Sequence, residues 1–297
     1  MNENPTKIKT LFIVNPFSGV GRHRNFAQMV SKSLDASVFD FKVVYTEAVG
    51  HASQLSEEAR DNGYQLIVAV GGDGTANEVA TPLVGSDVTL GLVPSGSGNG
   101  LARHLKIPLE TEKAISVLNH QKTRRIDTVK VNDRLFLSIA GVGFDAYVAF
   151  KFASKRQRGF LQYARIILLA YFKYRPGKYV LHLNGQKITR SALFISFANS
   201  DQFGYNTSIA PQARIDDGLM DISIMRKAPA WRVPFMLILF FMKKIDRTKY
   251  VEMLKTKEVM VEQKKKRINL DGETVKMGQE LHFEVIPASL NVAVPRV

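Results

Sequence analysis

The chain of 297 residues contains no cysteine and only one tryptophan. Without cysteine it cannot form a disulfide-stapled scaffold, a thiolate metal site or a cysteine nucleophile, and the composition fits a reducing compartment. Its most apolar stretch, residues 233–242, contains Pro234 and is too short to span a bilayer. The first residues lack the apolar core of a signal peptide. We therefore expect a soluble, cytoplasmic protein.

Acidic residues are missing from the middle of the chain, where none occurs between Asp145 and Asp201. Lysine and arginine are frequent in that interval and also form the run 264–267, and the net charge of the chain is +14. This distribution is compatible with an anionic partner, which would be a membrane surface or a nucleic acid. It is equally compatible with basic protein surfaces that contact only solvent. Because no nucleic-acid recognition motif accompanies the charge, no nucleic-acid partner is expected.

Several common catalytic signatures are also missing. The chain has no G-x-x-x-x-G-K-[ST] loop and no G-x-S-x-G turn, and its histidines lack metal-ligand spacing. Residues 141–146, Gly-Val-Gly-Phe-Asp-Ala, match the G-x-G-x-x-A pattern of dinucleotide-binding folds. That fold needs a ribose-binding acid about 20 residues further on, and the acid-free interval supplies none. We do not expect an NAD site there.

The most informative stretch of the chain is residues 66–79. Five apolar residues predict a buried strand, the turn Gly71-Gly72-Asp73-Gly74 comes next, and a helix is expected over residues 75–84. Glycines between a strand and a helix let main-chain N–H groups approach a phosphate. The Asp73 carboxylate would repel a bare phosphate, which suggests a metal ion between them. This layout is typical of a phosphoryl-transfer site.

Strand and helix patterns alternate over the first 130 residues, which predicts a parallel sheet covered on both faces. The expected strands are residues 10–14, 38–45, 66–70 and 89–93, and the expected helices are residues 52–62, 75–84, 101–105 and 110–120, with another helix around Phe26, Val30 and Leu34. Glycine-containing loops at residues 18–19, 71–74 and 96–100 come after three of these strands. Ligands of such sheets bind at the carboxyl ends of the strands, so we expect the three loops to converge.

Strand patterns dominate after residue 126. They are expected at residues 128–131, 135–139, 179–183, 192–198, 219–225, 258–262, 267–270 and 280–286, with helices at 160–173 and 230–244. Asn184-Gly185 predicts a hairpin turn. We therefore predict two domains, an α/β nucleotide-binding domain at residues 1–130 and a β-rich domain with antiparallel sheets at residues 131–297.

Five motifs occur in a fixed order along the chain. They are Asn15-Pro16-x-Ser18-Gly19, Gly71-Gly72-Asp73-Gly74-Thr75-x-Asn77-Glu78-Val79, Pro94-x-Gly96-Ser97-x-Asn99, Asp216-Asp217-Gly218-Leu219-Met220-Asp221 and Leu270-Asp271-Gly272-Glu273. Taken singly, several would be ordinary turns or helix caps. Together they resemble the diacylglycerol kinase catalytic-domain family, which includes bacterial soluble lipid kinases and the sphingosine and ceramide kinases. The resemblance covers nearly the whole chain.

The resemblance implies a fold and a site. The fold is an N-terminal NAD-kinase/diacylglycerol-kinase-like α/β domain and a C-terminal antiparallel β-sandwich that binds the lipid, with the active site in the cleft between them and the last residues returning to the first domain. It implies ATP as phosphate donor and Mg²⁺ as cofactor. The implied ATP-binding residues are Asn15, Thr46, Gly71, Gly72, Asp73, Gly74, Thr75, Ala76, Asn77 and Ser97.

The resemblance also assigns the catalytic and metal-binding roles. Asp73 would organise the catalytic Mg²⁺, and Glu273 would be the general base for the lipid hydroxyl. A structural magnesium site would use the Asp217 carboxylate with the main-chain oxygens of Arg214 and Leu219, and Asp127 would join the acidic network around the metal. Phosphoryl transfer depends mainly on positioning and charge neutralisation, which suits these residue types.

The expected activity is ATP-dependent phosphorylation of a lipid hydroxyl, first of diacylglycerol to give phosphatidic acid. Diacylglycerol kinases usually carry an aspartate where this chain has Gly100, and sphingosine-type members carry a small residue there. A sphingoid-base or ceramide-type acceptor is therefore the first alternative. An NAD kinase, whose family shares the Gly-Gly-Asp-Gly-Thr signature, and a non-catalytic nucleotide- or membrane-binding module are weaker alternatives.

A lipid acceptor gives the basic, apolar segments a purpose. Phe160, Leu161, Ile166, Ile167, Leu168, Leu169 and Phe172, mixed with Arg158, Arg165 and Lys173, predict an interfacial helix. Trp231 and residues 235–244 form a second candidate, for which a core helix with a basic rim is the alternative. We expect peripheral binding at the anionic inner face of the cell membrane. Homodimer formation is left open.

Overall fold

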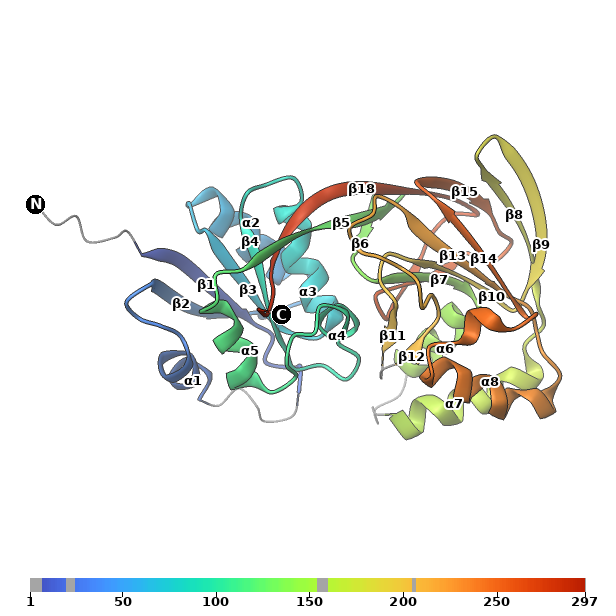
Figure 1. Ribbon diagram of the computed structural model, residues 1–297, viewed down its shortest axis with the longest axis horizontal. Coiled ribbons are helices and arrows are strands. Elements are labelled where there is room, and N and C mark those ends of the chain that lie inside the picture. Colours follow the sequence, from blue (N-terminus) through green and yellow to red (C-terminus); the bar gives the residue numbers. More distant parts are fainter. Residues whose placement is uncertain (1–6, 20–24, 154–159, 205–206, 297) are drawn as a thin grey trace, which may run out of the picture. The chain divides into compact units, whose positions relative to one another are not determined.

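The computed structural model describes residues 7–19, 25–153, 160–204 and 207–296. The chain divides into two compact units, which we call unit 1 and unit 2 (Figure 1). Unit 1 comprises Met1–Ile126 and Ala288–Val297, and unit 2 comprises Asp127–Pro287. Two strands, β5 (Thr123–Val131) and β18 (Glu280–Ala293), contain residues of both units.

Unit 1 is built on a parallel sheet with the strand order β2-β1-β3-β4. Its strands are β1 (Ile8–Val14), β2 (Phe39–Tyr45), β3 (Leu66–Gly71) and β4 (Thr89–Pro94). Every residue of β3 is buried, as expected for a central strand covered on both faces. The end of β18 continues the sheet, because Asn291 and Val292 pair in parallel with Thr89 and Leu90 of β4.

The helices of unit 1 alternate with these strands as the sequence predicts. They are α1 (Phe26–Ser33), α2 (His51–Asp61), α3 (Asp73–Ala80), the 3₁₀ helix η1 (Thr81–Leu83), α4 (Gly100–His104) and α5 (Thr111–Leu118). The expectation of one helix over residues 75–84 is wrong at both ends. The α-helix begins at Asp73 and ends at Ala80, and the chain continues as η1, which contains Pro82 and therefore lacks one N–H donor.

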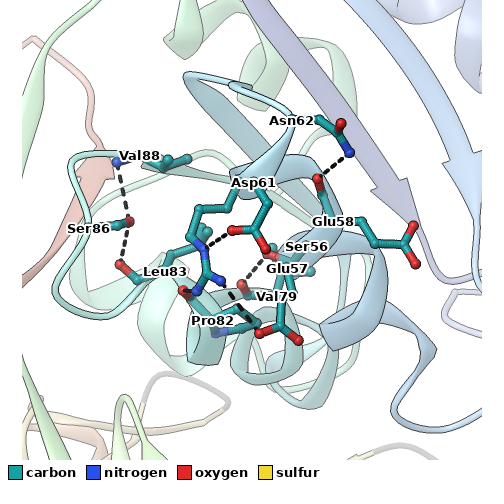
Figure 2. Close-up of polar contacts among 11 residues, drawn as sticks. Ser56, Glu57, Glu58, Asp61, Asn62, Val79, Pro82, Leu83, Ser86 and Val88 are labelled. Atoms are coloured by element: carbon teal, nitrogen blue, oxygen red, sulfur yellow. Dashed lines mark hydrogen bonds and ion pairs between the residues drawn. The ribbon is translucent and has the colours of Figure 1, made fainter.

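Hydrogen bonds from α2 hold α3 and η1 in place (Figure 2). The Ser56 hydroxyl donates to the Val79 carbonyl oxygen at 2.7 Å, and the Arg60 guanidinium donates to the Pro82 carbonyl oxygen at 2.6 Å. The first of these bonds is buried, where it satisfies a polar group that water cannot reach. The two bonds thereby fix the end of α3 and the 3₁₀ helix that continues it.

Unit 2 contains two antiparallel layers of strands. One is the sheet β14-β13-β10-β7-β16-β17, whose strands are β7 (Ile139–Gly143), β10 (Phe194–Ala198), β13 (Met220–Met225), β14 (Val251–Thr256), β16 (Arg267–Leu270) and β17 (Glu273–Lys276). The other joins β5 and β18 with β6 (Arg134–Phe136), β8 (Gly177–Leu183), β9 (Gln186–Ala192) and β15 (Glu258–Glu262).

Apolar side chains from both layers form one buried core, so unit 2 is the predicted β-sandwich. The rings of Phe197 in β10 and Phe283 in β18 stack across it with centroids 3.8 Å apart.

Outside the sandwich lie α6 (Phe144–Ala153), α7 (Phe160–Lys173), α8 (Val233–Phe241), the 3₁₀ helices η2 (Ala230–Arg232) and η3 (Ile245–Arg247), and the strands β11 (Gln202–Gly204) and β12 (Thr207–Ser208). Among the described residues, no helix has the length and apolar character needed to cross a bilayer.

Two strand predictions in unit 2 are wrong. The expected strand 135–139 is broken, because the Asp271 carboxylate accepts the N–H groups of Leu137, Ser138 and Ile139 at 2.8 to 3.0 Å and turns the chain between β6 and β7. The expected strand 192–198 is divided between β9 and β10. The strands β14 and β17 were not expected from the sequence pattern. The Asn184-Gly185 hairpin is confirmed, with φ of 50° and 71° at its two residues.

Candidate active site

The three glycine loops of unit 1 come directly after β1, β3 and β4 and contact one another. The Asn15 amide donates to the Thr75 hydroxyl at 3.0 Å, which joins the loop after β1 to the first turn of α3. The Ser18 and Ser95 hydroxyls lie 2.8 Å apart, which joins the loops after β1 and β4. The predicted convergence of these loops at one edge of the sheet is therefore confirmed.

Asp73 lies at the centre of this group of loops. Its two carboxylate oxygens accept the N–H groups of Asn99, at 2.8 Å, and Gly100, at 2.7 Å. Gly100 is the first residue of α4, so the carboxylate lies at the positive end of that short helix. The two bonds fix the orientation of the carboxylate. A small pocket lies against the same groups and is lined by Gly71, Gly72, Asp73 and Asn99 with apolar side chains.

Glycine is required where the second and third loops approach each other. A Cβ atom on Gly96 would lie 2.6 Å from the Gly72 Cα atom, and a Cβ on Gly98 would lie 2.8 Å from a carboxylate oxygen of Asp73. A Cβ on Gly71 would overlap the Thr75 side chain. The glycines thus keep side chains away from Asp73 and let the second and third loops pack closely against each other.

The remaining residues implied as ATP contacts lie around the same edge. Thr46 is buried just after β2, and its N–H donates to the Val14 carbonyl oxygen at 2.9 Å. Ala76 and Asn77 belong to α3, Gly74 lies in its first turn, and Ser97 is exposed in the loop after β4. The Gly50 N–H donates to a Glu78 carboxylate oxygen at 3.0 Å, which brings the loop after β2 to α3.

In unit 2, Glu273 is the first residue of β17 and pairs with Leu270 of β16. The two-residue turn between them, Asp271-Gly272, has φ of 47° and 93°, values that suit a type I′ hairpin. The Glu273 side chain is exposed. This two-residue turn sets the position of the Glu273 carboxylate at the start of β17.

The acidic turn before β13 has an unexpected partner. The Lys255 ammonium group contacts Oδ2 of Asp217 at 3.1 Å and Oδ2 of Asp221 at 3.2 Å. Burial raises the pKa of the Asp221 carboxyl and the neighbouring Asp217 charge adds to this effect, whereas Lys255 opposes it. Burial alone would lower the pKa of Lys255, but its bonds to the two carboxylates raise it. Asp127 lies at the same turn and accepts the Gly218 N–H at 2.7 Å.

The residues that would hold magnesium fit the ion differently in the two units. Around Asp73, the glycines keep side chains away from the carboxylate, which is a ligand of the kind that magnesium prefers. At Asp217, the side-chain cation of Lys255 already contacts the carboxylate. Within the described part of the chain, no group of three or more His, Asp or Glu side chains is arranged to hold a metal.

The sequence reasoning also missed the environment of Asp145 in α6. Its side chain is buried, and Oδ2 accepts a hydrogen bond from the Asn269 amide at 2.9 Å. Burial raises the pKa of Asp145 to about 6, and the bond from Asn269 opposes the shift. The apolar residues around position 145 could have suggested this burial, but nothing in the sequence identifies Asn269 as the partner.

Known proteins resemble the chain along most of its length. Residues 9–131 match the diacylglycerol kinase catalytic domain, and residues 138–294 match the YegS C-terminal NAD kinase beta sandwich-like domain. A Pseudomonas aeruginosa protein named "Probable lipid kinase YegS-like" is 32% identical over 83% of this chain and 82% of its own. A Bacillus subtilis protein named diacylglycerol kinase is 28% identical over 88% of each chain. A crystal structure of a diacylglycerol kinase from Bacillus anthracis superposes with a TM-score of 0.78 at 23% identity, covering 97% of both chains, which establishes the fold.

Proposed function

Because the chain belongs to the diacylglycerol kinase catalytic-domain family of lipid kinases, we propose that it transfers the γ-phosphate of ATP to a lipid hydroxyl group. The observation that carries the proposal is the convergence of the three glycine loops around Asp73 in unit 1. Loops of this kind suit a polyphosphate, because it needs main-chain N–H donors at close range and a metal-binding carboxylate beside them.

In this proposal, unit 1 binds the nucleotide. Asn15, Thr46, Ser97 and the residues Gly71, Gly72, Gly74, Thr75, Ala76 and Asn77 form the ATP-binding edge of the sheet. Asp73 holds a magnesium ion that accompanies ATP, and this ion would neutralise phosphate charge during transfer. The fixed orientation of the Asp73 carboxylate, with both oxygens accepting main-chain N–H groups, supports this role, since a preorganised group need not rearrange during the reaction.

Glu273 of unit 2 is proposed to accept the proton of the lipid hydroxyl as that oxygen attacks the γ-phosphorus. The proton passes to a Glu273 carboxylate oxygen, the new O–P bond forms, and the bond to the ADP oxygen breaks. The hairpin at Asp271-Gly272 supports this role, because the Asp271 carboxylate is tied to three main-chain N–H groups and leaves Glu273 as the exposed acid of the turn.

Diacylglycerol is the first proposed acceptor, in line with the name of the Bacillus subtilis relative. Gly100 favours a sphingoid base as the second candidate. Its N–H donates to Asp73, and the residue is buried at the start of α4, so an aspartate there would place a second carboxylate beside the first. The chain therefore has one acidic group where diacylglycerol kinases usually have two.

Phosphorylation of a panel of lipids tests the proposal. The purified protein is incubated with Mg²⁺, γ-labelled ATP and micelles that contain diacylglycerol, a sphingoid base or a ceramide, and a parallel reaction contains NAD. We expect label in phosphatidic acid, and a rate about 10²–10⁴-fold lower for Glu273→Gln, the size of a general-base contribution. The matched control Glu280→Gln removes another exposed carboxylate of unit 2 and should leave the rate unchanged. A folded protein that labels no lipid, or that converts NAD to NADP, would refute the proposal.

We also propose that unit 2 contacts the membrane that contains the acceptor. On α7, the side chains of Leu168, Leu169 and Phe172 are 55%, 61% and 63% exposed. Trp231 before α8 is 74% exposed, and α8 itself buries Met236 while its other large apolar side chains are mostly exposed. Exposed apolar groups beside basic ones suit an anionic bilayer. Arg158 and the side chains of Phe160 and Leu161, which the sequence places in the same surface, lie outside the described residues.

Sedimentation with lipid vesicles tests this surface. We expect binding to vesicles that contain phosphatidylglycerol and weaker binding to phosphatidylcholine alone, because the basic residues add about 1 kcal/mol each near an anionic surface. The double variant Leu169→Ser/Phe172→Ser should bind at least about tenfold more weakly, since two apolar side chains no longer enter the bilayer. Leu109→Ser, at an exposed leucine of unit 1, is the matched control. Equal binding by all three proteins would contradict the proposed surface.

A further inference from the structure

The acidic turn of unit 2 brings two carboxylates to one ammonium group. Asp221 and Lys255 are direct cross-strand partners of β13 and β14, and Asp217 lies in the turn just before β13. The Asp221 side chain is 3% exposed and the Asp217 side chain 19%, whereas that of Lys255 is 37% exposed. Lys255 therefore reaches from the surface to a pair of like charges that water reaches poorly.

The turn is held in this shape by main-chain bonds. Oδ1 of Asp217 accepts the Leu219 N–H at 3.1 Å. Asp127 makes two hydrogen bonds to the turn. Its Oδ2 accepts the Gly218 N–H at 2.7 Å, and its own N–H donates to the Ile215 carbonyl oxygen at 2.7 Å. Gly218 has φ of 70°, a conformation that glycine adopts without strain. The two carboxylates are thus brought together by the fold of the turn and require a positive charge beside them.

A divalent ion and the ammonium group of Lys255 would compete for this position. Magnesium binds oxygen ligands at 2.0–2.1 Å, so an ion on the Asp217 carboxylate would lie next to the ammonium group that already contacts Oδ2. Like charges at that separation repel strongly where the surroundings exclude water.

We infer that the ammonium group of Lys255 takes the place of a structural magnesium ion at this turn, so that unit 2 needs no divalent ion for its stability. The donor set predicted from the resemblance, the Asp217 carboxylate with the main-chain oxygens of Arg214 and Leu219, is present in the sequence. In this chain the counter-charge comes from a side chain of the neighbouring strand β14.

Thermal unfolding without nucleotide or lipid tests the inference. The melting temperature (Tm) of the unaltered protein should be the same in EDTA and in millimolar Mg²⁺. Lys255→Met should lower Tm in EDTA by roughly 5 °C or more, because the two carboxylates lose their counter-charge. Mg²⁺, but not an equal ionic strength of NaCl, should then restore much of the loss. Lys257→Met, at an exposed lysine two residues further on, is the matched control and should behave as the unaltered protein does.

The double variant Lys255→Met/Asp217→Asn locates the response. It should show no magnesium-dependent rise in Tm if the restored stability comes from an ion on Asp217. The inference is overturned if EDTA lowers the Tm of the unaltered protein and Asp217→Asn abolishes that effect. It is also overturned if Lys255→Met is as stable as the unaltered protein, or is less stable and not rescued by Mg²⁺.

If Lys255→Met does not fold, the comparison of Tm for the unaltered protein with and without EDTA decides the question. Lys255→Arg, which keeps the charge, should remain independent of magnesium. None of these measurements requires phosphorylation, so their outcome is separate from that of the proposed lipid kinase activity.

Discussion

Two aspartates of this chain lie in similar local sequences and in very different surroundings. Asp73 comes after the buried strand β3 and two glycines and begins α3, and Asp145 comes after β7, which ends in Gly143, and lies in the first turn of α6. Both are thus acids at a strand–glycine–helix junction. The sequence distinguishes them only through residues further along the chain.

The two carboxylates differ in the donors that reach them. Asp73 is partly exposed and accepts two main-chain N–H groups from the start of α4. Asp145 is 4% exposed and accepts one bond from the Asn269 amide, while its Oδ1 has no hydrogen-bond partner among the described residues. Burial raises the pKa of Asp145 to about 6. A junction of this kind can present a stable negative charge only where neighbouring elements supply donors.

Replacing Asp73 should have the largest effect on function. The Asp73→Asn side chain has the same size and keeps one acceptor oxygen, but it lacks the negative charge that we propose to hold the metal. We expect the rate of lipid phosphorylation to fall by about 10²-fold or more, the size seen when a preorganised electrostatic group is removed. A radiolabelled phosphorylation assay measures it. Activity within about threefold of the unaltered protein would remove Asp73 from the site.

Replacing Asp145 should have the next largest effect, this time on stability. Its pKa is raised from 3.8 to about 6 on folding, so the folded state holds the proton more tightly and stability is lost as the pH rises from about 4 to 6. Asp145→Asn removes this penalty and keeps an acceptor for Asn269. We expect its free energy of unfolding to exceed that of the unaltered protein by about 2–3 kcal/mol at pH 7.5.

Urea unfolding at pH 4 and pH 7.5 measures the Asp145 effect. The advantage of the variant should nearly vanish at pH 4, where the carboxyl is mostly protonated in the folded protein. An advantage of the same size at both pH values would show that the penalty does not come from ionisation. A variant less stable at pH 7.5 would show that the ionised carboxylate is itself stabilising.

Replacing a glycine of the Asp73 surroundings should have the smallest of the three effects. Gly96→Ala places a Cβ atom 2.6 Å from the Gly72 Cα atom, so the two loops must separate. We expect a loss of about 1–3 kcal/mol in the free energy of unfolding, the usual result of overpacking, together with weaker ATP binding by calorimetry. At the matched control Gly278, an added Cβ would have 3.7 Å to its nearest neighbour, and Gly278→Ala should be close to neutral. Equal stability of both variants would contradict the close approach of the loops.

Much of the fold could be predicted because its signals are local. The alternation of apolar strands and helices in unit 1, the Asn184-Gly185 hairpin and the glycine loops after β1, β3 and β4 all arise from neighbouring residues. The order of the five motifs identified the family, which the domain matches establish. One of the wrong predictions has a distant cause, because the Asp271 carboxylate accepts the N–H groups of residues 137–139 and separates β6 from β7.

The sequence by itself determined the class of the two sheets, the glycine turns and the kind of acid at each turn, because backbone preference and apolar periodicity depend on residues close in the chain. Only the tertiary structure decided which acids have which partners. The N–H groups that hold Asp73 come from the next glycine loop, the amide that meets Asp145 comes from β16, and the cation beside Asp217 and Asp221 comes from β14. A charge takes its chemical role from the groups that surround it in space, and spacing along the chain does not specify these groups.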